Sequence, residues 1–140
     1  MKAVALFKVV LIAGLVFQVF SIAAGLVLVN TLPPLLQSYL AEVANNEVST
    51  GYAVFLLSYL LVTFVLVPVN YYGLWKFRSW ARVLNVVLTL MTVFSLAFTG
   101  PFVMTGLAYM FFSIASILEG VLIVMMFSGE IGEKFSKLNS

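Results

Sequence analysis

The chain lacks cysteine and histidine altogether and carries little charge. Its 140 residues include no Cys and no His, and only 9% are Asp, Glu, Lys or Arg, whereas soluble domains carry about 25%. Without Cys, disulfides, thiolate metal sites and thiol redox chemistry are excluded. Without His, the commonest metal ligand and general base is missing. We also find no glycine-rich phosphate loop and no nucleophile beside a base, so we expect no metal, no cofactor and no enzymatic activity.

Apolar residues, in contrast, make up 64% of the chain. A soluble domain of this size has too much surface for its volume to hide so much apolar area. Lipid as the surrounding solvent removes this difficulty. The net charge is only +2, and no basic patch stands out that would favour nucleic acid as a partner. The composition therefore predicts an integral membrane protein.

Four apolar runs are each long enough to cross a bilayer, which takes about 20 helical residues. They cover residues 3–29, 52–74, 80–98 and 102–127. The first run is longer than the apolar core of a signal peptide, which has about 7–15 residues, so we expect a retained helix. The sequence thus predicts an all-α polytopic protein, with one membrane domain over residues 1–140 that forms a four-transmembrane-helix bundle.

The positions of the basic residues predict the orientation of this bundle. They lie near the N-terminus, between the second and third runs, and in the tail: Lys2, Lys8, Lys76, Arg78, Arg82, Lys134 and Lys137. Basic segments next to membrane spans stay on the cytoplasmic side. We therefore expect cytoplasmic N and C termini, a cytoplasmic hairpin at residues 75–79, a cytoplasmic tail at 128–140 and an external loop at 31–51.

The external loop has the pattern of a short amphipathic helix. Pro33 and Pro34 end the first run. Apolar residues then recur at helical spacing, with polar residues on the other side: Leu35, Leu36, Tyr39, Leu40 and Val43 against Gln37, Ser38 and Glu42. Such a helix lies on the membrane surface. It serves either as a cap on the bundle or as a docking surface for a partner.

Polar and small residues recur every three or four positions within the apolar runs. This spacing places them on one face of each helix, which we expect to point into the bundle, either for close packing or to line a path. At a rise of 1.5 Å per residue, Glu119 would lie roughly 13 Å from the cytoplasmic edge. Gln18 and Thr89 would lie at about the same depth, and Asn70 and Asn85 one turn closer to the cytoplasm. We predict an intramembrane polar layer made of Glu119, Gln18, Thr89, Asn85 and Asn70.

Glu119 is the only ionisable member of this layer. A carboxylate near the bilayer midplane costs about 2.5–3.5 kcal/mol on insertion scales, and it is a functional hypothesis by default. Three interpretations are open. Glu119 locks helix four to its neighbours, or it binds a proton, a cation or a cationic substrate, or it meets a polar or basic group of a partner membrane protein.

The hairpin between the second and third runs combines aromatic and basic residues. We predict a lipid-headgroup anchor made of Trp75, Lys76, Arg78, Trp80 and Arg82, because tryptophan and basic side chains favour the membrane interface. Arg82 lies at the membrane edge, from which its long side chain can reach towards the polar layer.

This hairpin resembles one found in small uncharacterised four-helix bacterial inner-membrane proteins. The shared pattern is Gly73-Leu74-Trp75, a short basic turn, and Trp80-Ala81-Arg82. The end of the fourth run is similar too, with Glu119-Gly120, an aliphatic stretch, Phe127-Ser128 and Phe135. Many members have Pro after that Ser, where this chain has Gly129. The resemblance covers roughly a third of the chain; it implies a multi-pass protein of the bacterial inner membrane and supplies no activity.

These features favour a non-catalytic accessory, assembly or structural subunit that acts by lateral helix contacts in a membrane complex. Its expected partners are the lipid bilayer and another membrane protein or a second copy. The alternative is a small oligomeric transporter or channel that uses Glu119 for a proton, a cation or a cationic substrate. A bundle of four helices has little room for a pore, so that alternative needs a second copy or a partner chain.

Overall fold

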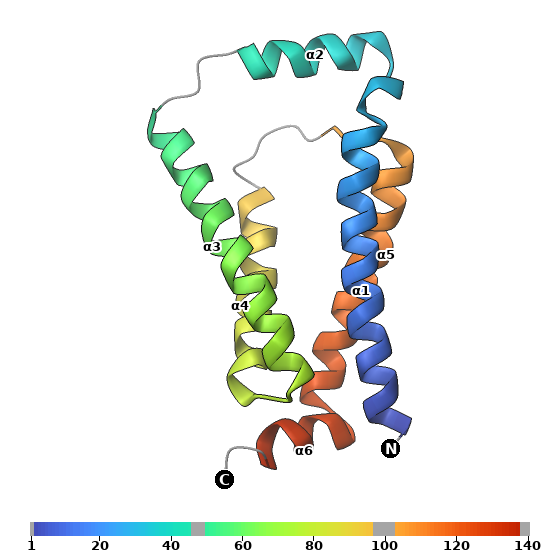
Figure 1. Ribbon diagram of the computed structural model, residues 1–140, viewed down its shortest axis with the longest axis vertical. Helices are drawn as coiled ribbons and strands as arrows, with labels where there is room; N and C mark the ends of the chain where they lie inside the picture. Colours follow the sequence, from blue (N-terminus) through green and yellow to red (C-terminus); the bar gives the residue numbers. More distant parts are fainter. Residues whose placement is uncertain (1, 46–49, 97–102, 138–140) are drawn as a thin grey trace.

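The computed structural model is all-α over the residues that it describes, 2–45, 50–96 and 103–137. Within these ranges it contains six α-helices and one 3-10 turn: α1 (Lys2–Val27), η1 (Val29–Thr31), α2 (Pro34–Asn45), α3 (Thr50–Trp75), α4 (Ser79–Leu96), α5 (Gly106–Phe127) and α6 (Gly129–Lys137). Four long helices run along the molecule, while α2 crosses one end and α6 crosses the other, next to the start of α1 (Figure 1).

Three helices are long and apolar enough to cross a membrane: α1, the Leu57–Trp75 part of α3, and α5. They fall within or overlap the predicted runs 3–29, 52–74 and 102–127. The predicted run 80–98 corresponds to α4, whose apolar stretch Ser79–Ser95 is shorter, and residues 97 and 98 lie outside the described ranges. Helices of this length and composition indicate association with a membrane.

The long helices are arranged as two pairs. Helix α1 packs along α5, and α3 forms a hairpin with α4, while the contact between the pairs is mainly that of α4 with α5. The pairs lie close together at the α6 end and spread apart towards the α2 end (Figure 1). The end of the molecule that carries α6 is therefore the junction of the two pairs.

Small residues bring α1 and α5 together. Gly14 is buried against Leu118, where an added Cβ would lie 3.8 Å from the Leu118 Cβ. About two turns further along α1, the Ser21 hydroxyl donates a hydrogen bond to the Ala108 carbonyl at 2.9 Å. Small side chains permit close approach of helix backbones in lipid, where no hydrophobic force drives helices together. These two contacts fix the position of α1 along α5.

Three phenylalanine side chains form an aromatic cluster at the junction of the two helix pairs. The rings of Phe7, Phe77 and Phe135 are buried. The centroid of the Phe7 ring lies 5.4 Å from that of Phe77 and 5.9 Å from that of Phe135, and the centroids of Phe77 and Phe135 are 5.2 Å apart. Ile131 and Phe135, four residues apart on α6, both pack into this cluster, because residues at that spacing share one helix face. The predicted cytoplasmic tail at 128–140 thus contains a helix that folds back across the bundle.

The turn between α3 and α4 has a Schellman motif. The Arg78 N–H donates to the Gly73 carbonyl at 2.9 Å, and the Phe77 N–H donates to the Leu74 carbonyl at 3.1 Å. Phe77 occupies the left-handed position of this motif with φ 55°, where glycine is usual. The left-handed conformation costs roughly 1–2 kcal/mol for such a residue, and burial of the phenyl ring in the aromatic cluster offsets that cost.

Gly73 provides the close approach in this hairpin, and replacing it with alanine tests the packing. An added Cβ would lie 2.7 Å from the Ala81 Cβ and 2.6 Å from the Trp80 ring, which is closer than real Cβ contacts. We expect Gly73→Ala to lower the free energy of unfolding in detergent by about 1–3 kcal/mol, as overpacking does. Gly120→Ala is the control, because its added Cβ meets no atom within 4 Å. Equal stability of the two variants would contradict this packing.

Candidate functional site

Hydrogen bonds join three helices through four polar side chains inside the bundle. Asn70 on α3 donates from Nδ2 to Asn85 Oδ1 on α4, and Asn85 donates from Nδ2 to Glu119 Oε1 on α5. The Thr89 hydroxyl, one turn after Asn85, lies 3.1 Å from the same Glu119 oxygen. We call Asn70, Asn85, Thr89 and Glu119 the polar chain. Asn85 and Thr89 can act together because residues four apart share one face of a helix.

The polar chain is shielded at the α3 end. Asn70 is 2% exposed and Asn85 is 4% exposed, while Thr89 and Glu119 are partly buried. The Asn70 Oδ1 atom is buried and has no hydrogen-bond partner. An unpaired buried acceptor costs about 1–3 kcal/mol. Both amide N–H donors are thus directed along the chain towards Glu119, and the unpaired acceptor is left at the opposite end.

The structure does not bring Gln18 to these four residues. Its side chain is exposed and lines a groove of about 430 Å³ formed by α1, η1 and the start of α5. Gly14 is the α1 residue that packs against Leu118, next to Glu119. Gln18 therefore lies about one turn further towards the α2 end. Its neighbours in the groove include Ser21, Gly25 and Thr105.

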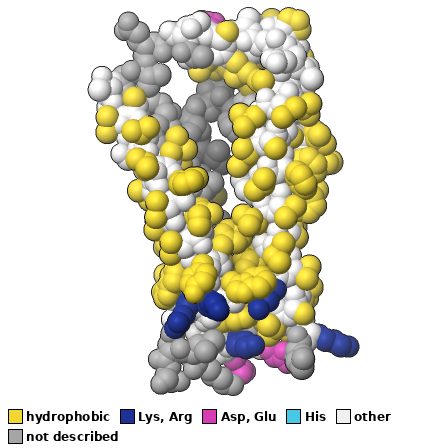
Figure 2. Space-filling view, in the orientation of Figure 1, with side chains coloured by type: hydrophobic (Ala, Val, Ile, Leu, Met, Phe, Trp, Pro, Cys, Tyr) yellow, Lys and Arg dark blue, Asp and Glu magenta, His cyan; other side chains and the backbone are white. Residues whose placement is uncertain are grey.

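The five residues of the predicted headgroup anchor lie at the junction end. Trp75, Lys76, Arg78 and Trp80 are exposed, and Arg82 is partly buried. Lys8 on α1 places its ammonium 4.2 Å from the centre of a Trp75 ring, a cation–π contact. Basic side chains form a band below the apolar surface, with acidic side chains beyond it (Figure 2). This is the distribution expected where a bundle leaves a bilayer.

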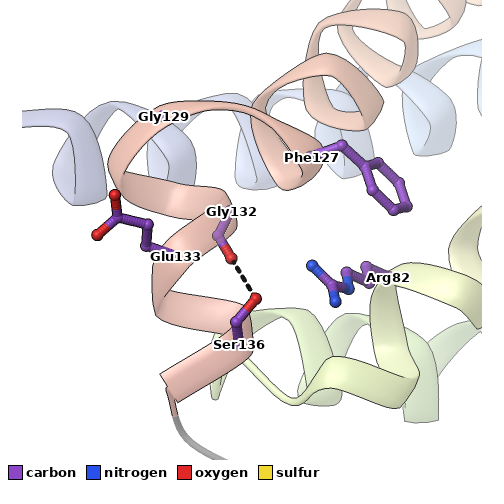
Figure 3. Close-up of a pocket in the computed structure, with 6 residues that line it drawn as sticks. All are labelled: Arg82, Phe127, Gly129, Gly132, Glu133 and Ser136. Atoms are coloured by element: carbon purple, nitrogen blue, oxygen red, sulfur yellow. Dashed lines mark hydrogen bonds between the residues drawn. The ribbon is translucent and has the colours of Figure 1, made fainter.

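A second cavity, of about 370 Å³, lies where α4, α5 and α6 meet. It is lined by Arg82, Phe127, Gly129, Gly132, Glu133 and Ser136. Arg82 points towards α6, whereas Glu133 lies on the other side of that helix (Figure 3). The Arg82 guanidinium stands 5.5 Å from the centre of the Phe127 ring, and the Ser136 hydroxyl donates to the Gly132 carbonyl at 3.2 Å. The sequence pattern did not predict this cavity, although the spacing of Ile131 and Phe135 was a signal for α6.

The side chains of these sites define the chemistry that they can offer. Among the described residues, no group of three or more Asp, Glu, His or Cys side chains could hold a metal ion. The polar chain offers one carboxylate, two amides and a hydroxyl, which can form hydrogen bonds and exchange a proton. Comparison with protein families, with curated proteins and with solved structures finds no match to this chain.

Replacing Asn85 tests whether the polar chain holds the two helix pairs together. Asn85→Leu removes the acceptor of Asn70 and a donor to Glu119, so both groups lose a buried partner. We expect the free energy of unfolding in mixed detergent micelles to fall by about 1–3 kcal/mol, the cost of leaving such groups unpaired. Thr92→Val is the matched control, because the exposed Thr92 hydroxyl bonds only to the Leu88 carbonyl of its own helix. A loss no larger than that of the control would contradict this role.

Proposed function

We propose that this chain is a non-catalytic subunit of a membrane complex, and that it acts by lateral contact with a transmembrane helix of another membrane protein. The observation that carries the proposal is the exposure of Gln18 in the groove along α1. In a bilayer, a side-chain amide away from water is costly unless it forms hydrogen bonds. A polar side chain on a partner helix would supply them.

The shape of the groove supports a helix as the occupant. One wall runs from Gln18 on α1 to Val29 at the start of η1 and includes Ser21, Gly25 and Leu26, a length of roughly 16 Å or three helical turns. A Cβ added at Gly25 would meet no atom within 4 Å, so a partner backbone can approach there. Small residues beside a hydrogen-bonding side chain are the usual elements of helix association in membranes.

We further propose that α4 is a fourth membrane span and that both ends of the chain lie in the cytoplasm of a bacterial cell, as a multi-pass protein of the inner membrane. Support comes from the antiparallel hairpin of α3 and α4, the basic side chains gathered at the junction end, and α2 lying across the far end (Figures 1 and 2). In this orientation α2 is the external amphipathic helix.

Cysteine labelling tests this orientation directly, because the chain has no Cys of its own. Ser38 on α2 and Ser136 on α6 are both exposed. We expect a membrane-impermeant maleimide to label Ser38→Cys in intact cells or right-side-out vesicles, and to label Ser136→Cys only after the membrane is opened. Labelling of both positions from one side would mean that the number of spans is not four.

Photo-crosslinking tests the proposed lateral contact. A photo-reactive residue in place of Gln18 should give a discrete crosslinked protein band in cell membranes. The same residue in place of the exposed Val16 is the control, because positions two apart point to nearly opposite sides of a helix. Equal crosslinking patterns at the two positions would contradict the proposal.

Substituting Gln18 tests the same contact through its strength. Hydrogen bonds between membrane helices contribute about 1 kcal/mol. Gln18→Leu should therefore reduce, roughly fivefold, the amount of the partner identified by crosslinking that co-purifies with this chain. If the band at position 18 proves to be a dimer of this chain, the partner is a second copy. Unchanged recovery of the partner with Gln18→Leu would show that the amide makes no useful contact.

A further inference from the structure

We propose that Glu119 is a proton-binding site inside the bundle, and that Thr89 provides hydrogen bonds suited to both the protonated and the ionised carboxyl group. The proposal uses none of the residues of the Gln18 groove, so it stands or falls separately from the lateral contact. It rests on the partners of Glu119, on the position of the Thr89 hydroxyl and on the direction of the hydrogen bonds in the polar chain.

Glu119 has neutral hydrogen-bond partners. Its hydrogen bonds come from the Asn85 amide and the Thr89 hydroxyl, and no Lys or Arg among the described residues pairs with it. An ion pair would hold the carboxylate in its charged form. Amide and hydroxyl groups do not, because both can also bond a carboxylic acid.

The charged and titratable groups on the surrounding helices leave Glu119 without a counter-ion. On α3, Tyr71 is the titratable group that interacts with Glu119. On α4, Arg82 is turned towards Phe127 and the cavity of Figure 3. On α1, Lys8 lies over Trp75, and on α6, Lys134 lies over the Phe77 ring. The acidic residues of α6, Glu130 and Glu133, are exposed at the junction end.

The Thr89 hydroxyl lies between two acceptors. Its hydroxyl oxygen is 2.9 Å from the Asn85 backbone carbonyl and 3.1 Å from Glu119 Oε1. A hydroxyl has one hydrogen and can donate to only one acceptor at a time, but it keeps lone pairs that accept. Thr89 can therefore donate to an ionised Glu119, or donate to Asn85 and accept from a protonated Glu119.

The binding step follows from these two arrangements. A hydronium ion in the surrounding water transfers its proton to Glu119 Oε1: one O–H bond of the hydronium breaks, an O–H bond forms at the carboxyl group, and a water molecule is released. The charge of the carboxyl group changes from −1 to 0. The Thr89 hydroxyl turns its hydrogen to the Asn85 carbonyl, and its oxygen accepts the new hydrogen bond from Glu119. No bond between heavy atoms forms or breaks, and no helix has to move. Release of the proton reverses each change.

The polar chain suits a proton better than a metal cation. Asn85 donates an N–H to Glu119 Oε1, the Thr89 hydroxyl lies at hydrogen-bond distance from the same oxygen, and Asn70 donates to Asn85. A bound Ca²⁺ ion, for comparison, takes 6–8 oxygen ligands. A proton needs one carboxylate oxygen and one acceptor, both of which are present.

Infrared difference spectroscopy of the full chain in liposomes tests the proposal. We expect a carboxyl C=O band that grows as the pH is lowered and disappears as it is raised, and that Glu119→Gln removes completely. Gln keeps an acceptor oxygen for Asn85 and Thr89, so this variant should keep its fold, which circular dichroism can check. Identical pH-difference spectra from wild type and Glu119→Gln would overturn the proposal.

A second variant keeps the test decisive if Glu119→Gln fails to fold. All five acidic residues of the chain are glutamates, so changing Glu42, Glu47, Glu130 and Glu133 to Gln leaves Glu119 as the only acidic side chain. We expect this variant to show the intramembrane carboxyl band alone, above the contribution of the C-terminal carboxylate. A pH-difference spectrum from this variant that shows no more than the contribution of the C-terminal carboxylate would also overturn the proposal.

Thr89 is tested by the frequency of the same band. Thr89→Val removes the hydroxyl at similar volume, so the protonated carboxyl loses its acceptor and its C=O band should move to higher wavenumber. Thr89→Ser restores the hydroxyl and should restore the wild-type position. An unshifted band in Thr89→Val would remove Thr89 from the site. A band that is suppressed by NaCl but not by choline chloride at equal ionic strength would show that a metal cation is the ligand, against the proposal.

Discussion

The hydrogen bonds that Asn85 and Thr89 of α4 make to Glu119 of α5 connect two helix pairs that otherwise have little contact. In a bilayer, helices gain nothing from the hydrophobic effect when they associate, so packing and hydrogen bonds must hold them together. The α1–α5 pair has close packing at Gly14, and the α3–α4 pair has it at Gly73. Between the pairs, the polar chain takes the place of such packing, and it sets the level at which α4 meets α5.

This link and the aromatic cluster lie towards the same end of the molecule. Phe7, Phe77 and Phe135 join α1, the α3–α4 turn and α6, and the polar chain lies further into the bundle. With both connections towards one end, the pairs spread at the other end (Figure 1). The spread leaves the α2 end of α1 uncovered, which is why Gln18 and Gly25 line an open groove while Gly14 is buried. The groove and the polar chain are thus consequences of the same arrangement.

The periodicity of each helix predicted which of its faces is polar, and for α3, α4 and α5 the side chains on those faces meet. Asn85 and Thr89 are four residues apart, so their shared face follows from helix geometry alone. Gln18 was predicted at the same level and lies elsewhere, because periodicity fixes the face of a helix but not its position along a neighbour. That position depends on contacts between helices, here Gly14 with Leu118 and Ser21 with Ala108. The left-handed conformation of Phe77 was likewise not predictable from the sequence, since it depends on burial of the Phe77 ring by α6.

Two of the three interpretations of Glu119 are compatible with each other in this structure: it can connect α5 to its neighbours and also bind a proton. An ion pair would connect the helices in only one charge state of the carboxyl group. Loss of the carboxylate charge would leave the cation unpaired in a medium of low dielectric constant. Arg82 is within one turn of Asn85 along α4, yet its guanidinium stands over Phe127. Glu119 is therefore held by an amide and a hydroxyl, which can bond either form of a carboxyl group. Hydrogen bonds thus connect the helix pairs both before and after a proton is bound, and only the bond between Thr89 and Glu119 reverses its direction.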